Sequence, residues 1–194
     1  MRPVVALLTR GAVAWISGVT TVVLLVAIPA RVPEAIASAS GYTGHCSMLA
    51  LDMNLWPPNI EDVLDAYGDS GRRAVKIFHL TYDALFPAAF ALLLLNVLAR
   101  VGRGAGQTMQ AIFVSLPFVG GLADYSENLA FILLARFHSS EALPAIWLWL
   151  TGFFTLTKFL ADGGAIFLIV TFAAKRLKSL PGAAAPPPQP DQRS

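Results

Sequence analysis

The stretch MQAIFVSLPFVGGLADYSENLAFILLA, residues 109–135, decides the predicted fold. It is longer than the roughly 20 helical residues that cross a bilayer core of about 30 Å. Asp124, Glu127 and Asn128 stand within it, and their i, i+3, i+4 spacing places them on one face of a helix. Polar groups in such a segment face other helices rather than lipid. The stretch therefore predicts a transmembrane helix with a polar inner face.

Three further stretches are long and apolar enough to cross a bilayer: residues 12–30, 77–99 and 143–174. The chain is 56% hydrophobic and 13% charged, whereas soluble domains carry about 25% charged residues. We therefore predict an all-α fold, a four-transmembrane-helix bundle that forms a single membrane domain over residues 1–178. The Pro/Ala-rich segment 179–194 is expected to be a disordered cytoplasmic tail.

The basic residues predict the orientation of this bundle. Eight of the fourteen lysines and arginines fall in short segments on one side of the topology, namely Arg2, Arg10, Arg100, Arg103, Lys175, Arg176, Lys178 and Arg193. By the positive-inside rule this side is cytoplasmic. Both termini are then expected in the cytoplasm, with the protein in the inner or plasma membrane.

The first span has an alternative interpretation as a cleaved signal peptide, with the small residues 37–39 near the cleavage site. Signal peptides usually have an apolar region of about 7–15 residues, and this run is longer. A retained anchor is therefore favoured, and the alternative would leave three spans in the same orientation.

The segment 31–76 is predicted to be the outer loop. Asn59 is a candidate helix cap, and Gly68 is a candidate end of the same helix. Between them, an apolar stripe is formed by Ile60, Val63, Leu64 and Tyr67. These features predict a short extracytoplasmic amphipathic helix on the outer membrane surface. Arg72 and Arg73 are expected to contact lipid headgroups.

Ionisable residues inside three of the spans are the candidate functional site. A rise of 1.5 Å per residue puts the carboxylates of spans two and three at a depth comparable to Lys158 in span four. The candidate cluster, for binding or for proton handling, consists of His79, Asp83, Asp124, Glu127, Asn128, Lys158 and Asp162.

The charges of this cluster predict how it pairs. Lys158 is expected to pair with Glu127 or Asp124, while Asp83 would crowd the remaining carboxylate of span three. One of these crowded carboxyls would hold a proton at neutral pH. Polar residues also fasten membrane helices without any further role. Five ionisable groups on three spans favour a functional site, because their insertion costs add.

A metal centre is an alternative that the sequence does not favour. His79, Asp83, Asp124 and Glu127 supply one imidazole and three carboxylates, but the Glu-x-x-His pairs of metal-binding helical bundles are missing. Cys46 is the single cysteine, so it cannot form an internal disulfide. We predict no metal and no cofactor.

Two runs of residues carry a resemblance to a known family. They are Tyr67-Gly68…Gly71-Arg72…Leu80-Thr81-Tyr82-Asp83…Phe86-Pro87 and Leu116-Pro117…Asp124-Tyr125…Glu127-Asn128. Together they resemble an uncharacterised group of four-span bacterial integral membrane proteins with GR, LxxD…P and LP…DYxEN signatures. The resemblance covers about residues 60–175. It implies the four-helix architecture and draws attention to Asp83, Pro87 and the acidic residues of span three, but it implies no activity.

Three functions are compatible with these observations. A small transporter-like or proton-handling unit is favoured, and it would be expected to form a homo-oligomer because four spans are few. A membrane enzyme or lipid-binding protein would use the carboxylates as general acid and base toward a lipid-like or small-molecule ligand. A structural or accessory subunit would use them only to join helices. The lipid bilayer is the expected partner, and the net charge of +2 gives no indication of nucleic-acid binding.

Overall fold

A computed structural model describes residues 11–30, 32–39, 41, 57–138 and 146–179. In this part of the chain the regular elements are the helices α2 (Gly11–Ala30), α3 (Val32–Ala39), α5 (Pro57–Thr81), α6 (Phe86–Val101), α7 (Gln107–Phe137) and α8 (Ile146–Lys178). These residues form no strand, so the predicted all-α class is confirmed. Cys46 and the predicted tail lie outside the described residues.

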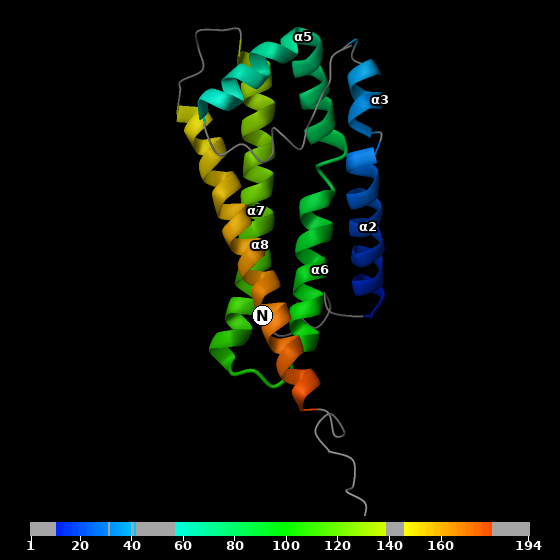
Figure 1. The fold of residues 1–194 in the computed structure, drawn as a ribbon, viewed down its shortest axis with the longest axis vertical. Coiled ribbons are helices and arrows are strands. Elements are labelled where there is room, and N and C mark those ends of the chain that lie inside the picture. Colours follow the sequence, from blue (N-terminus) through cyan, green and yellow to red (C-terminus); the bar gives the residue numbers. More distant parts are fainter. Residues whose placement is uncertain (1–10, 31, 40, 42–56, 139–145, 180–194) are drawn as a thin grey trace, which may run out of the picture.

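The helices form an elongated bundle (Figure 1). Helices α7 and α8 run antiparallel along its length and share its most extensive contact. Helix α6 packs against both, and α2 packs on α6. Three predicted spans, 12–30, 109–135 and 143–174, coincide with α2, α7 and α8.

By length and composition, α8 is the described helix that could cross a membrane by itself. The bent pair formed by α5 from Ile60 onward and α6 would make a second span if counted as one. Helix α7 is comparably long, but its carboxylates, its asparagine and Pro117 reduce its apolar character.

The second predicted span is not the continuous helix expected over residues 77–99. Helix α5 ends at Thr81 and α6 begins at Phe86, with a bend of 40° between the two segments. Pro87, in the first turn of α6, is the physical reason. Its ring lacks an N–H and would clash with the carbonyl of Asp83, four residues earlier, in a continuous helix.

Helix α5 is itself bent at Gly68, which has φ 57° and ψ −168°. The predicted helix end at Gly68 is therefore confirmed, because a positive φ suits glycine and few other residues. The first limb of α5 begins at Pro57 rather than at Asn59. Proline is tolerated in the first turn of a helix, where its missing N–H has no partner to lose.

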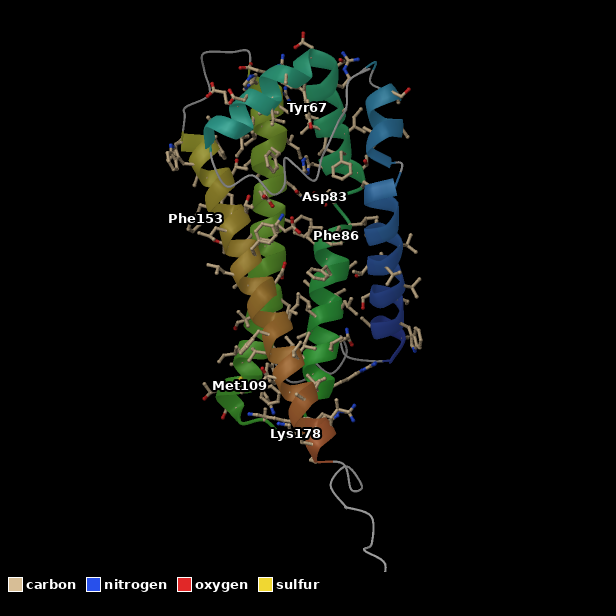
Figure 2. The ribbon with its side chains drawn as sticks, viewed as in Figure 1. Tyr67, Asp83, Phe86, Met109, Phe153 and Lys178 are labelled. Carbon is tan, nitrogen blue, oxygen red and sulfur yellow. The ribbon has the colours of Figure 1, made fainter. Side chains whose placement is uncertain are left out.

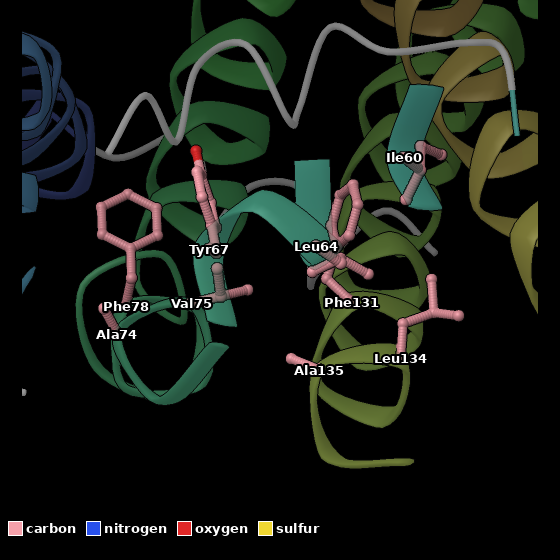
Figure 3. Packing of buried hydrophobic residues seen from close by; sticks show 9 residues of the cluster. All are labelled: Ile60, Leu64, Tyr67, Ala74, Val75, Phe78, Phe131, Leu134 and Ala135. Carbon is pink, nitrogen blue, oxygen red and sulfur yellow. The ribbon is translucent and has the colours of Figure 1, made fainter. Parts of the chain in front are cut away.

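The apolar stripe of this first limb is buried inside the protein rather than on a membrane surface (Figure 3). Ile60, Leu64 and Tyr67 pack with Phe131 and Leu134 of α7. Ile60 and Leu64 have no exposed surface at all. The limb lies across one end of the bundle, where it covers the end of α7 (Figure 1).

Arg72 holds the bend at Gly68 instead of reaching toward headgroups. Its Nη1 donates a hydrogen bond to the carbonyl oxygen of Leu64 over 3.0 Å, and its Nη2 pairs with Asp69 Oδ1 at 2.6 Å. A carbonyl near the end of the first limb thus gains a charged donor, which lipid contact would not supply. Arg73 is exposed, so its expected headgroup contact stays a prediction.

Besides its buried apolar clusters, the described part of the chain buries several polar groups and exposes many apolar ones. Large hydrophobic side chains are exposed along α2, α7 and α8 (Figure 2), including Trp15, Val19, Val22, Phe118, Leu122, Leu129, Phe153, Leu160, Phe167 and Val170. The buried polar and charged residues are Ser17, Thr21, His79, Asp83, Asn96, Asp124, Glu127, Asn128, Thr151 and Thr155. Exposed apolar side chains in such number, together with buried charged groups, are unusual for a protein surrounded by water.

Candidate functional site

The antiparallel contact of α7 and α8 brings together the polar residues of both helices. On α7, Asp124 and Glu127 are three residues apart and share a face. On α8, Thr155 and Lys158 have the same spacing in the opposite chain direction. Two antiparallel helices with matching spacing place these side chains level with one another, so a polar seam forms along the contact.

Lys158 is the central cation of the seam. Its Nζ contacts Glu127 Oε2 and lies 3.3 Å from Asp124 Oδ1. The exposed fractions of the three side chains are 13%, 1% and 7% for Lys158, Glu127 and Asp124. The predicted pairing of Lys158 with Glu127 or Asp124 is confirmed, and the lysine in fact contacts both carboxylates.

Thr155 completes the surroundings of Glu127. Its hydroxyl lies against Glu127 Oε1 and 3.0 Å from the carbonyl oxygen of Thr151, one turn earlier in α8. A hydroxyl carries one proton, so it donates to one of these oxygens at a time. Each carboxylate oxygen of Glu127 therefore has a polar neighbour from α8.

Asp162 lies one turn beyond Lys158 on α8 and is half-buried against α7. A Cβ added to Gly120 of α7 would stand 3.0 Å from the carboxyl carbon of Asp162 and closer still to its Oδ1. The glycine thus leaves the space that this carboxylate occupies.

A second polar cluster lies where α5 ends. His79 Nδ1 is 3.0 Å from Asp83 Oδ2 and 3.1 Å from Asn128 Oδ1. Both neighbours are acceptors, since the amide nitrogen of Asn128 faces the carbonyl oxygen of Asp83 at 3.3 Å. With Asp83 ionised, this arrangement fits the tautomer in which His79 Nδ1 carries the proton. The imidazole also stacks on the ring of Phe131, with 5.2 Å between centroids.

Side chains of α7 hold the break between α5 and α6. The Tyr125 hydroxyl donates to the carbonyl oxygen of Ala84 over 2.9 Å, and the Asn128 amide donates to that of Asp83. These two carbonyls lie in the interruption that Pro87 imposes. A break in a helix leaves backbone carbonyls without their intrahelical partners, and these two side chains replace them.

The seven predicted site residues therefore fall into two groups and one flanking position. His79, Asp83 and Asn128 form the cluster at the break, while Asp124, Glu127 and Lys158 form the seam. Asn128 follows Glu127 directly in α7, so the two groups adjoin. Asp162 flanks the seam.

One predicted contact is wrong. Asp83 was expected to crowd the span-three carboxylate that Lys158 leaves over, but Lys158 contacts both of these carboxylates and Asp83 pairs with His79. The seam takes both carboxylates of α7 instead. The prediction failed because it allowed Lys158 one carboxylate only and did not consider the pairing of Asp83 with His79, four residues earlier.

Sequence reasoning left three residues of the site unrecognised. Thr155 and Phe131 were not among the candidate residues, and Tyr125 was named only within the family signature. Tyr125 lies three residues before Asn128, and this spacing on one face is the signal that could have revealed it. Phe131 follows Glu127 by four residues, but its stacking on His79 depends on the packing of two helices.

The described residues contain no group of three or more His, Cys, Asp and Glu side chains arranged to hold a metal ion. Comparisons with protein-family models, with curated proteins and with solved structures find no match to this chain.

Proposed function

We propose that the chain is a multi-pass integral membrane protein that transfers protons. The proton path would consist of the seam between α7 and α8 and the adjoining cluster at the break between α5 and α6. The proposal of four spans is supported by the exposed apolar side chains on α2, α7 and α8 (Figure 2). Exposure of such an apolar surface to water would be unfavourable, whereas the lipid of a bilayer would cover it. A helix that places charges on its inner face can also span, because neighbouring helices pair those charges.

The distribution of charge at the two ends supports an orientation with both termini in the cytoplasm. Lys178 lies at one end of the bundle and Tyr67 at the other (Figure 2). The last turn of α8 carries Lys175, Arg176 and Lys178, and the end of α6 beside it carries Arg100. The opposite end carries the exposed acids Glu61, Asp62, Asp65 and Asp69 together with Arg72, Arg73, Lys76 and Arg136, so its net charge is near zero. The positive-inside rule assigns the basic end to the cytoplasm.

The seam would then lie deep in the hydrocarbon. Lys158 is about 18 Å along the axis from the start of α8, and Asp124 is about 20 Å from the end of α7. A bilayer core is about 30 Å thick, so both positions are far from either interface. Charges at such depth cost several kcal/mol unless they are paired.

One observation carries the proposed function, namely that Lys158 lies between two buried carboxylates. Asp124 and Glu127 carry one more formal negative charge than the lysine balances. A shared proton removes this excess at lower cost than an unpaired charge. The neighbouring His79, with Asp83, extends the set of groups that can give and take protons.

The break between α5 and α6 supports the same proposal. Interrupted membrane helices beside ionisable groups are a recurrent feature of transporters, where the break forms part of the ion or substrate site. Here the break contains Asp83, and side chains of α7 stabilise its backbone. A chain that needed only to hold helices together would gain nothing from interrupting one.

Reconstituted vesicles test the proposal. The purified protein is placed in liposomes with an internal pH dye, and a potassium gradient with valinomycin drives proton entry. We expect uptake above that of empty liposomes, lost in Asp124→Asn and Glu127→Gln. Glu61→Gln, the same change at an exposed position, is the control and should conduct like the wild type. Wild-type vesicles no faster than empty ones would overturn the proposal.

A second candidate, a structural or accessory subunit, is favoured by one observation. Both carboxylates of α7 have partners within the chain, and Thr155 provides a further contact to Glu127. This is also what interhelical fastening requires. In the vesicle experiment, this candidate predicts folded protein and no proton uptake in any variant.

A further inference from the structure

Asp162 flanks the seam and is the next carboxylate in the direction of the basic end of α8. It is half-buried, whereas Asp124 and Glu127 are buried. Beyond it, the described residues of α6, α7 and α8 pack an apolar cluster that includes Leu98 and Phe113. A proton that moved along the seam toward the basic end would reach Asp162 as the last titratable group before this apolar cluster.

Lys158 can reach Asp162 without any movement of the backbone. The two residues are four apart on α8, a spacing that puts Cβ atoms about 5–6 Å from each other. Lysine places its ammonium on a flexible four-carbon stem. The same ammonium that contacts Asp124 and Glu127 can therefore turn toward the next carboxylate by rotating its side chain.

Packing against Gly120 fixes where the carboxylate of Asp162 lies. The carboxylate occupies the space in which any larger residue at position 120 would place its Cβ. Gly163, beside Asp162 on α8, differs from Gly120, because a Cβ at position 163 would have nothing within 4 Å. Alanine at position 120 would push the carboxylate away from α7, and alanine at position 163 would not.

We propose that Asp162, seated on Gly120, is the relay residue that accepts the proton from Lys158, an inference that rests on the proposed function. An N–H bond of the ammonium breaks and an O–H bond forms on Asp162, which leaves a neutral amine and a neutral acid. The amine then takes a proton from the carboxyl group of Glu127 or Asp124, which returns to carboxylate. Asp162 finally releases its proton toward the basic end. One proton moves and no electron is transferred.

Four proteins reconstituted in the same vesicles test the relay: the wild type, Asp162→Asn, Gly120→Ala and Gly163→Ala. We expect the rate of proton uptake to fall about a hundredfold in Asp162→Asn, the low end of what one positioned proton-transfer group contributes. Gly120→Ala should also lower the rate of proton uptake, although this variant keeps every ionisable group. Gly163→Ala is the matched control and should conduct like the wild type.

Infrared difference spectra after a pH jump give a readout that packing alone would not produce. The wild type should show a carboxylic C=O band that Asp162→Asn removes, that Gly120→Ala shifts and that Gly163→Ala leaves in place. Normal wild-type uptake with unchanged uptake in Asp162→Asn would overturn the relay but not the proposed function. An unchanged band in Asp162→Asn would also overturn the relay. Wild-type vesicles without uptake would instead overturn the proposed function.

Discussion

Replacing Lys158 and Glu127 singly and together tests whether the seam is an energetically coupled unit. Lys158→Met keeps the length of the side chain but leaves the two carboxylates, 7% and 1% exposed, without their cation. Removing one partner of a buried pair costs about 3–5 kcal/mol. Glu127→Gln should cost less, about 1–2 kcal/mol, because Lys158 keeps Asp124 at 3.3 Å and the new amide can still accept from Thr155.

The double variant should be less destabilised than the sum of the two single variants. Without Lys158, the exchange of Glu127 for glutamine removes a repulsion instead of an attraction. Coupling energies between contacting groups reach about 0.5–3 kcal/mol, and we expect about 1–3 kcal/mol here.

The free energy of unfolding, measured in mixed micelles with tryptophan fluorescence, supplies these values. Lys178→Met and Glu61→Gln make the same chemical changes at exposed positions, so each should stay within about 0.5 kcal/mol of the wild type. Two results would refute the reasoning. One is a Lys158→Met variant as stable as Lys178→Met, and the other is a double variant equal to the sum within about 0.5 kcal/mol.

Three further predictions concern the scaffold. Tyr125→Phe removes the donor to the carbonyl of Ala84, so it should cost about 1 kcal/mol and speed amide hydrogen exchange in the break. Gly68→Ala should cost about 1–2 kcal/mol in the same unfolding assay because φ is 57° there, whereas Gly163→Ala should be neutral or stabilising. Leu64→Ala should cost about 2–5 kcal/mol, because this side chain is fully buried; a loss under about 1 kcal/mol would mean that the first limb of α5 does not pack on α7.

The sequence was sufficient to predict α7 and α8, the two helices that carry the seam, because apolar length and helical spacing are local properties. The residues 124, 127 and 128 share a face in any helix, so the polar face of α7 did not depend on packing. The lysine pairing followed from charge and depth together. These properties do not depend on how the neighbouring helices pack.

The break at Pro87 is the point at which the sequence was misread. A proline within an apolar run either ends a helix or is tolerated, and Pro117 inside α7 shows the second outcome in the same chain. The difference lies in partners from elsewhere, since Tyr125 and Asn128 stabilise the interruption before Pro87. Such contacts between distant residues cannot be read from a local pattern.

The apolar stripe of the first limb of α5 was also assigned to the wrong surroundings. Its spacing predicts an amphipathic helix, and a membrane surface and a protein surface satisfy that pattern equally well. Phe131 and Leu134 of α7, far away in the sequence, provide the protein surface. A periodic pattern identifies the face that is buried but not what buries it.

Spin labels on the apolar faces of three helices test most directly whether the seam is enclosed in a membrane. Cysteines replace Val19, Leu122 and Leu160, each exposed and near the middle of α2, α7 or α8, in a Cys46→Ser background. In liposomes, collision with oxygen should be frequent at all three labels, and collision with a water-soluble nickel chelate should be rare. Nickel access at Val19 or Leu122 as high as at exposed Asp62 would contradict the multi-pass account.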